Sequence, residues 1–109
     1  MTDLAQKKCV ACEGMVNPFV REEAEVLLRQ VKDWKLSDDA KGISKEFSFK
    51  DFASALSFTN KVGAIAEAEG HHPDIELGWG RVAVHLTTHA IKGLSENDFI
   101  VAAKIDELA

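Results

Sequence analysis

The sequence predicts a single α+β domain, residues 1–109, in which helices and strands follow in the order α-β-β-α-β-β-α. Three segments have helical features. Between them lie two pairs of short segments in which apolar and polar residues alternate, each pair joined by a turn that contains glycine. Strands joined by such short turns pair antiparallel. A four-stranded, mostly antiparallel sheet with three helices on one face is the simplest way to bury the apolar sides of these elements.

The first 19 residues are expected to form an irregular N-terminal arm. A first helix should follow, because apolar residues recur at the spacing of one helix face, at Ala24, Leu27, Leu28 and Val31. Trp34 and Leu36 indicate a short first strand, with Trp34 in the core, and residues 38–42 form a turn. Residues 43–49 then alternate as a second strand with one buried face, although Lys45 falls in the apolar register.

The second helix should run from about residue 51 to residue 69. Asp51 suits the positive end of the helix dipole, and Gly70 can end the helix in the left-handed conformation. The inner face of this helix is predicted to consist of Phe52, Ala55, Leu56, Thr59, Val62, Gly63 and Ala66.

Two more strands and a helix complete the chain. The alternation of Ile75, Leu77 and Trp79 predicts a third strand, with Trp79 more readily a core residue than a ligand contact. A turn at residues 78–80 leads into a fourth strand over residues 81–85. Ser95 and Asp98 have the spacing of a capping box and open a last helix.

Composition limits the classes of function. A net charge of -5 argues against a nucleic-acid partner, whose phosphates attract basic faces. No apolar run approaches the roughly 20 residues that span a membrane, and the N-terminus lacks an apolar signal core, so we expect a cytoplasmic protein without a membrane partner. A chain of 109 residues buries a small core, which favours a homo-oligomer.

Cys9 and Cys12 form a lone Cys-x-x-Cys pair. A closed zinc site needs four ligands, and a thioredoxin-like motif would lie between a strand and a helix rather than in a polar arm. We interpret the two cysteines as reduced thiols, with a redox or metal role as the alternative.

All four histidines lie between residues 71 and 89. Histidine titrates closest to neutral pH, so such a cluster indicates proton transfer. His71 and His72 follow the predicted helix end, and Pro73 pushes His72 into extended geometry, so both side chains can face a cleft. His85 is expected on the exposed side of its strand.

The spacing of these residues resembles the signature of the pterin-4a-carbinolamine dehydratases. That signature has an acidic residue, His-His-Pro four positions later, an aromatic residue, a further His and an Asp. The matching residues are Glu67, His71, His72, Pro73, Trp79, His89 and Asp98. Asp33-Trp34 and Thr87-Thr88-His89 ahead of Gly93-Leu94-Ser95 are also similar to the family, and the resemblance runs from about Val20 to the C-terminus.

The resemblance implies dehydration of 4a-hydroxytetrahydropterin to quinonoid dihydropterin and water, which recycles the pterin cofactor of aromatic amino-acid hydroxylases. The pterin is then the substrate, and neither a metal nor another cofactor is needed. The implied partners are this small molecule, further copies of the chain in a dimer or tetramer, and an aromatic amino-acid hydroxylase as a candidate.

The resemblance also suggests roles for single residues. His71 is the first candidate for general acid/base catalysis, His72 for positioning the pterin, and His89 for a further catalytic role. Glu67 could handle protons or support a histidine. Asp98 could either cap its helix or orient a histidine, and Trp79 could stack on a flat ring. Pro73 belongs to the binding residues through its place in the signature.

Two other classes of function compete with the dehydratase. A metal site would draw on His71, His72, Asp74, His85 and His89. However, His85 and His89 would lie about 13 Å apart on a strand, too far to share one ion. The second alternative is a non-enzymatic interaction module, because some animal members of the family also bind a transcription factor.

Overall fold

The computed structural model describes residues 4–9 and 17–108, and the element order agrees with the α-β-β-α-β-β-α prediction. The helices are α1 (Arg21–Leu28), α2 (Phe52–Glu69) and α3 (Glu96–Asp106). The strands are β1 (Lys35–Leu36), β2 (Ile43–Ser48), β3 (Asp74–Gly78) and β4 (Arg81–Leu86). Two short 3-10 helices, η1 (Leu4–Gln6) and η2 (His89–Ile91), complete the set.

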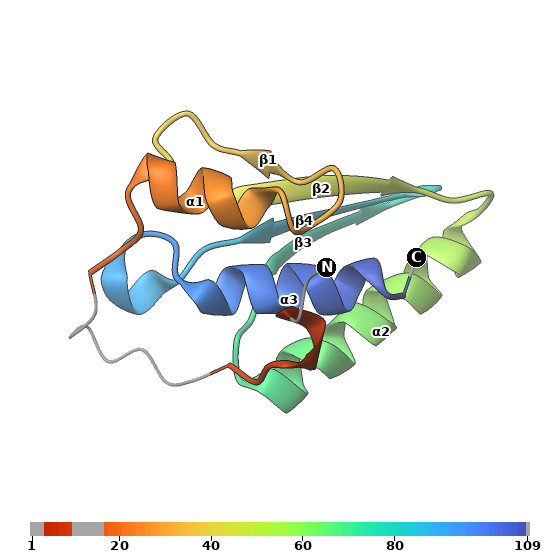
Figure 1. The fold of residues 1–109 in the computed structure, drawn as a ribbon. Helices are drawn as coiled ribbons and strands as arrows, with labels where there is room; N and C mark the ends of the chain where they lie inside the picture. Colours follow the sequence, from red (N-terminus) through yellow and green to blue (C-terminus); the bar gives the residue numbers. More distant parts are fainter. Residues whose placement is uncertain (1–3, 10–16, 109) are drawn as a thin grey trace.

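The sheet has the strand order β1-β2-β4-β3, and every neighbouring pair is antiparallel. The predicted α+β class with helices on one face is confirmed, and Figure 1 shows α2 and α3 lying beneath the sheet. The β3–β4 register pairs Asp74 with His85 and Gly78 with Arg81. The residues that precede β3 and those that follow β4 therefore leave the sheet at the same end.

Helix α2 has the predicted ends but a different inner face. Asp51 Oδ1 accepts a hydrogen bond from Ser54 N at 2.8 Å, and Gly70 ends the helix with φ of 64°. Its buried residues are Ala55, Phe58, Val62 and Ala66. The prediction that Phe52 and Leu56 face inward is wrong, because their exposed fractions are 44% and 40%. The sheet is in contact with the Phe58 side of the helix, where the Phe58 and Phe47 rings have centroids 4.6 Å apart.

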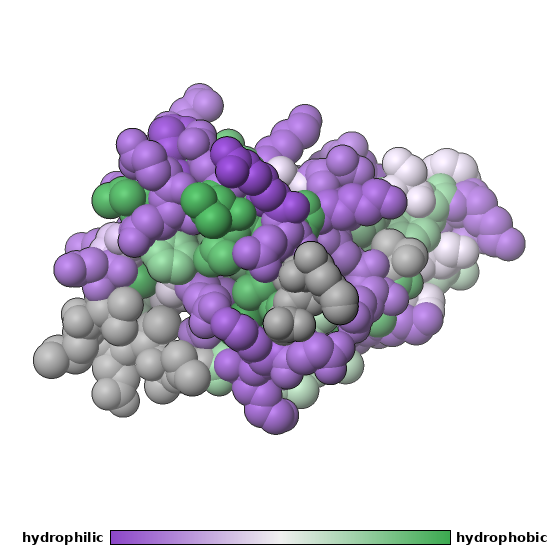
Figure 2. Space-filling view, in the orientation of Figure 1, coloured by the Kyte–Doolittle hydropathy of each residue, from purple (hydrophilic) through white to green (hydrophobic). Residues whose placement is uncertain are grey.

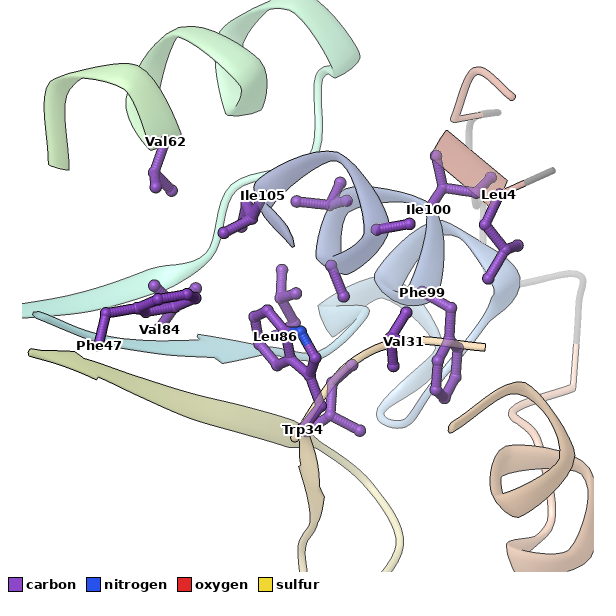
Figure 3. Close-up of a cluster of buried hydrophobic side chains, with 14 of the residues drawn as sticks. Leu4, Val31, Trp34, Phe47, Val62, Val84, Leu86, Phe99, Ile100 and Ile105 are labelled. Carbon is purple, nitrogen blue, oxygen red and sulfur yellow. The ribbon is translucent and has the colours of Figure 1, made fainter. Parts of the chain in front are cut away.

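Helix α3 is the centre of the core, and most of its residues are buried. It packs against η1, α2 and α1, so both apolar and polar side chains around it are removed from water. Figure 3 shows Ile100 and Ile105 of this helix together with Val84 and Leu86 of β4. Trp34, which was predicted to be a core residue, belongs to the same cluster with an exposed fraction of 5%.

Lys45 is the exception to the apolar register of β2, and α3 explains it. Its Nζ lies 2.9 Å from Asp106 Oδ1 near the end of α3, and the same oxygen accepts a hydrogen bond from Trp34 Nε1 at 3.0 Å. The ammonium group also lies 4.8 Å from the centroid of the Phe47 ring. A buried charge needs a partner of opposite charge, and Asp106 provides it.

Part of the N-terminal arm that was predicted to be irregular is a helical turn. Residues Leu4–Gln6 form η1, which packs against α3, and Leu4 is buried in the core cluster beside Ile100 (Figure 3). The described part of the arm therefore belongs to the folded domain. Cys12 lies outside the described residues, so its predicted state is not addressed by the structure.

Most of the face shown in Figure 2 is hydrophilic, with hydrophobic areas around α1 and toward the end where α2 begins. Val20 lies just before α1 and Val26 lies within it, and both are more than half exposed. Few other large apolar side chains of the described residues are exposed to this extent. The molecule thus leaves apolar surface on two of its helices.

Candidate active site at the junction of α2, β4 and α3

The end of α2 places the His71–His72 pair at a sharp corner. Gly70 takes the left-handed conformation, and the backbone N–H of His71 donates to Ala66 O at 3.2 Å, which closes the last helical turn. Pro73 then directs the chain into β3, which begins at Asp74. The corner inferred from Gly70 and Pro73 is therefore present, and it projects His71 inward and His72 outward.

His71 is joined directly to Asp98 of α3. Its Nε2 lies 2.6 Å from Asp98 Oδ1, and the exposed fractions of the two side chains are 11% and 0%. The two residues are 27 positions apart, so only the packing of α2 against α3 brings them together. The structure thus pairs a nearly buried imidazole with a fully buried carboxyl group.

Asp98 caps its helix and holds His71 at the same time. Its Oδ2 accepts hydrogen bonds from Ser95 N at 3.0 Å and from Thr88 Oγ1 at 2.8 Å, while Oδ1 is left for His71. Thr88 Oγ1 also lies 2.8 Å from Ser95 Oγ. Asp98 therefore caps its helix and contacts His71 in the same structure.

His89 is brought to this network by its neighbour in the chain. It begins η2, after β4 has ended at Leu86, and its side chain is exposed. Thr88, immediately before it, is buried and bonded to Asp98, and its N–H donates to Gly93 O at 2.9 Å. The loop that carries His89 is thus anchored beside the His71–Asp98 pair.

His72 and Glu67 form a second, exposed pair. His72 Nε2 lies 2.5 Å from Glu67 Oε2, and the exposed fractions of the side chains are 60% and 78%. Both come from the same corner, since Glu67 belongs to the last turn of α2. Glu67 thus supports His72 rather than His71, and solvent or a ligand can reach both.

His85 belongs to a different surface. It is 45% exposed, as predicted, and its Nε2 lies 3.0 Å from Glu76 Oε2. Glu76 also accepts a hydrogen bond from Arg81 Nη2 at 3.2 Å, and these hydrogen bonds, first from Arg81 and then from His85, lower the pKa of the Glu76 carboxyl. This network stabilises the side of the sheet that faces away from the helices.

A hollow of about 340 Å³ opens at the end of the sheet where β3 begins and β4 ends. Asp74, Thr87 and Lys41 are among its lining residues, and so is His85, whereas His71, His72 and His89 are not. Because Asp74 follows the His-His-Pro corner and Thr87 precedes Thr88, the hollow adjoins the backbone that carries the signature histidines.

No group of three or more His, Cys, Asp or Glu side chains suited to a metal ion occurs within residues 4–9 and 17–108. Within the same ranges, no helix combines the length and the apolar character needed to cross a membrane.

Comparisons with known proteins show the family of the chain. Residues 17–108 match the family model of pterin 4 alpha carbinolamine dehydratase. The chain belongs to the pterin-4a-carbinolamine dehydratase family. Relatives from Methylococcus capsulatus and Halorhodospira halophila, both provisionally named as this dehydratase, are each 53% identical and cover 97% and 96% of the chain. The matches span 93% and 96% of those relatives.

Solved structures of the dehydratase family have the same fold. A transcriptional coactivator/pterin dehydratase from Brucella melitensis is 33% identical, with a TM-score of 0.80 over 85% of this chain and 99% of its own. A pterin dehydratase-like protein described as a RuBisCO assembly factor in the alpha-carboxysome is 26% identical, with a TM-score of 0.62. That match covers 72% of this chain and 90% of the assembly factor.

One residue of the dehydratase signature stands apart from the others. Trp79 lies in the β3–β4 turn and is 74% exposed, so the prediction that it packs in the core is wrong. Neighbouring Gly80 needs a positive φ of 68° for the tight turn, which turns Trp79 out of the sheet. The turn is at the opposite end of β3 from His72, and the length of the strand, about 13 Å over four residues, separates them.

Two further residues take part in the site without having been predicted as site residues. Thr88 and Ser95 both contact the Asp98 carboxyl group. The capping-box spacing indicates the Ser95 contact, because that pattern is local. The Thr88 contact closes only when the loop after β4 packs on the start of α3, so sequence spacing carries no direct signal for it.

Proposed function

We propose that this chain catalyses the dehydration of 4a-hydroxytetrahydropterin to quinonoid dihydropterin and water. The observation that carries the proposal is the 2.6 Å contact between His71 Nε2 and the fully buried Asp98. A carboxylate that holds one ring nitrogen of a histidine fixes the orientation and tautomer of the ring, as in hydrolase triads. Membership of the dehydratase family supports the choice of substrate class.

Asp98 defines which nitrogen of His71 can react. Oδ2 already accepts hydrogen bonds from Thr88 and Ser95, which leaves Oδ1 to contact His71. Because a carboxylate oxygen can only accept, the Nε2–H of His71 is the donor in that contact. The Nδ1 atom then carries the free lone pair. We assign to Nδ1 the proton exchange with the substrate.

The reaction requires one proton to be given and one to be taken. The 4a-hydroxyl group leaves as water after it receives a proton, and the C–O bond breaks with its electron pair. The adjacent ring nitrogen loses its proton and forms the new C=N bond, so no oxidant or reductant takes part. We assign these two transfers to His71 and His89, and each transfer is typically worth about 10²–10⁴ in rate.

His72 is assigned to holding the pterin. It is exposed on the outer side of the corner and its Nε2 is engaged by Glu67. An exposed imidazole supported by a carboxylate can offer its remaining nitrogen to a polar edge of the substrate. Its removal should weaken binding more than it slows the chemical step.

Alanine variants of the four histidines test these assignments. We expect His71→Ala and His89→Ala to lower kcat at least about tenfold each. His72→Ala should chiefly raise KM, and His85→Ala should change neither parameter by more than about twofold because it lies on the Glu76–Arg81 network. The measurement is stopped-flow dehydration of 4a-carbinolamine, with folding checked by circular dichroism. Damage by His85→Ala combined with a silent His71→Ala would show that the active site is misplaced.

An interaction role is the second candidate function, because the 26% identical relative is described as an assembly factor. The same assay separates the two functions. A wild-type chain that does not accelerate dehydration, yet forms a stable complex that persists after substitution of His71, His72 and His89, would favour the interaction role.

A further inference from the structure

The part of the N-terminal arm that the structure describes is residues 4–9, which we call the arm below. It contacts α3 at several points. Leu4 is buried with an exposed fraction of 3%, and Lys104 Nζ donates to Ala5 O at 2.8 Å. Farther along, Lys7 Nζ lies 2.7 Å from Glu96 Oε2. The arm therefore runs beside α3 from near its C-terminal end toward its first turn, and Figure 1 shows η1 lying against this helix.

The last described residue of the arm is held by α2. The backbone N–H of Cys9 donates to Glu69 Oε1 at 2.9 Å, and Glu69 Oε2 lies 3.8 Å from Lys104 Nζ. The exposed fractions of the Glu69 and Lys104 side chains are 8% and 19%. One partly buried ion pair thus binds the arm backbone twice, at Ala5 through Lys104 and at Cys9 through Glu69.

This attachment lies close to the point where His71 and Asp98 meet. Glu69 is the last residue of α2, two positions before His71, and the Cys9 thiol lies 3.7 Å from the carbonyl oxygen of Asn97, next to Asp98. The arm therefore bridges the end of α2 and the start of α3. The His71–Asp98 contact depends on the relative position of these same two helix ends.

We propose that Glu69 is a positioning residue for the dehydratase reaction, acting through the arm to hold the end of α2 against the start of α3 and so to keep His71 on Asp98. This inference rests on the proposed function for its kinetic part only. Glu69 does not touch the reacting atoms. Its contribution is geometric, and a displacement of a catalytic group by about 1 Å can lower a rate by about 10²-fold.

The pKa values of Glu69 and Cys9 are consistent with a stable hydrogen bond between the Cys9 N–H and the Glu69 carboxylate. The N–H of Cys9 is the main cause that lowers the pKa of the Glu69 carboxyl, and Lys104 adds to it. Burial, followed by the Glu69 and Asp98 charges, raises the pKa of the Cys9 thiol to about 12 from 9.0. At neutral pH docked Cys9 therefore carries less thiolate than a free thiol.

The kinetic test compares two substitutions at Glu69 with a control on the same arm. Glu69→Ala removes the acceptor for Cys9 N–H, so kcat should fall about tenfold while KM stays within about twofold. Glu69→Gln keeps an amide oxygen for that N–H and should retain kcat within about threefold. Glu96→Ala breaks the exposed pair with Lys7 and should leave kcat unchanged. Phe58→Leu supplies a variant destabilised in the core away from this junction.

Two readouts need no substrate and therefore judge the inference even if the chain shows no dehydration. In a Cys12→Ser background, alkylation of Cys9 should be about tenfold or more faster in Glu69→Ala than in Glu69→Gln, which removes the same charge but keeps the acceptor, and it should remain slow in Glu96→Ala. The contact with buried Asp98 should protect the ring N–H proton of His71 from exchange, so that its signal is visible in the proton NMR spectrum of the wild type. That signal should disappear in Glu69→Ala and persist in Glu69→Gln and Phe58→Leu.

Any of three results would overturn the inference. Slow Cys9 alkylation in Glu69→Ala would show that Glu69 does not hold the arm. Fast alkylation together with an intact His71 ring proton would show that the arm is released without consequence for the catalytic pair. A loss of kcat in Phe58→Leu equal to that in Glu69→Ala would assign the effect to lower stability alone.

Discussion

Asp98→Asn separates the two tasks of this side chain, because asparagine keeps the shape of the carboxyl group but replaces one oxygen with an N–H donor. The amide oxygen can still accept from Ser95 N and Thr88 Oγ1, at 3.0 and 2.8 Å in the wild type. The amide nitrogen then faces His71 Nε2, 2.6 Å from the atom that it replaces. His71 must accept at Nε2 and carry its proton on Nδ1, which is the nitrogen assigned to the substrate.

The size of the effect follows from these contacts. A histidine held in the wrong tautomer loses its acid/base contribution, so kcat should fall by about 10²–10⁴-fold while KM changes by less than about threefold. Hydrogen bonds to a charged group are worth roughly 1.5–3 kcal/mol and neutral ones about 1, and removal of a buried charge offsets part of the difference. We expect a net loss of about 1–3 kcal/mol, or a Tm lower by roughly 5–20 °C.

The assay is stopped-flow dehydration at a temperature well below both melting transitions, together with thermal unfolding followed by circular dichroism. Asp106→Asn is the matched control, because Asp106 also accepts hydrogen bonds from buried partners, Trp34 and Lys45, and belongs to the same helix. It should lower Tm and leave kcat near the wild-type value. A lowered Tm with unchanged kcat in Asp98→Asn would refute the orienting role and leave Asp98 as a helix cap.

Three further predictions concern the surface and the arm. We propose a homo-oligomer that covers the exposed Phe52 and Leu56 of α2. Light scattering should give a multiple of the monomer mass at micromolar concentration, and a monomer mass would contradict this. Trp79→Ala should change the free energy of unfolding by less than about 1 kcal/mol, because the side chain is 74% exposed; a loss of about 3 kcal/mol or more in urea unfolding would restore the core interpretation. The lowered pKa of Glu69 means that its stabilisation is present above the ordinary carboxyl pKa and is lost as pH falls through the folded value. Wild type and Glu69→Gln should therefore differ in Tm at pH 7 and converge near pH 2, and a gap of equal size at both pH values would exclude this linkage.

Local patterns predicted most of the fold because they act over a few residues. The ends of α2 follow from Asp51 and Gly70, whose side-chain and backbone preferences are satisfied within one helical turn. The alternation in β2 and β4 places one side of each strand in the core, as observed for Phe47 and Val84. Such features are properties of the local sequence, so they do not depend on what the helix or strand packs against.

The departures from prediction at α2 and at Lys45 depend on a distant partner, whereas the one at Trp79 depends on a local turn. Helical periodicity gives an apolar side to α2, but the packing of Phe58 on Phe47 decides which part of that side is covered. Lys45 occupies an apolar register because Asp106, 61 residues away, supplies the compensating charge. Trp79 leaves the core because a two-residue turn ends β3 before it.

The candidate site divides in the same way. The sequence by itself determined the family and the residue types that carry the chemistry, because their spacing is a property of the chain. These residues are Glu67, His71, His72, His89 and Asp98. The sequence also placed the His-His pair at a corner, through Gly70 and Pro73. Only the tertiary structure decided that Asp98 holds His71 and that Glu67 holds His72. It also decided that Thr88 completes the network and that the arm reaches Glu69. The physical reason is that hydrogen bonds form over about 3 Å in space, whereas most of these partners lie 10 to 60 residues apart in sequence.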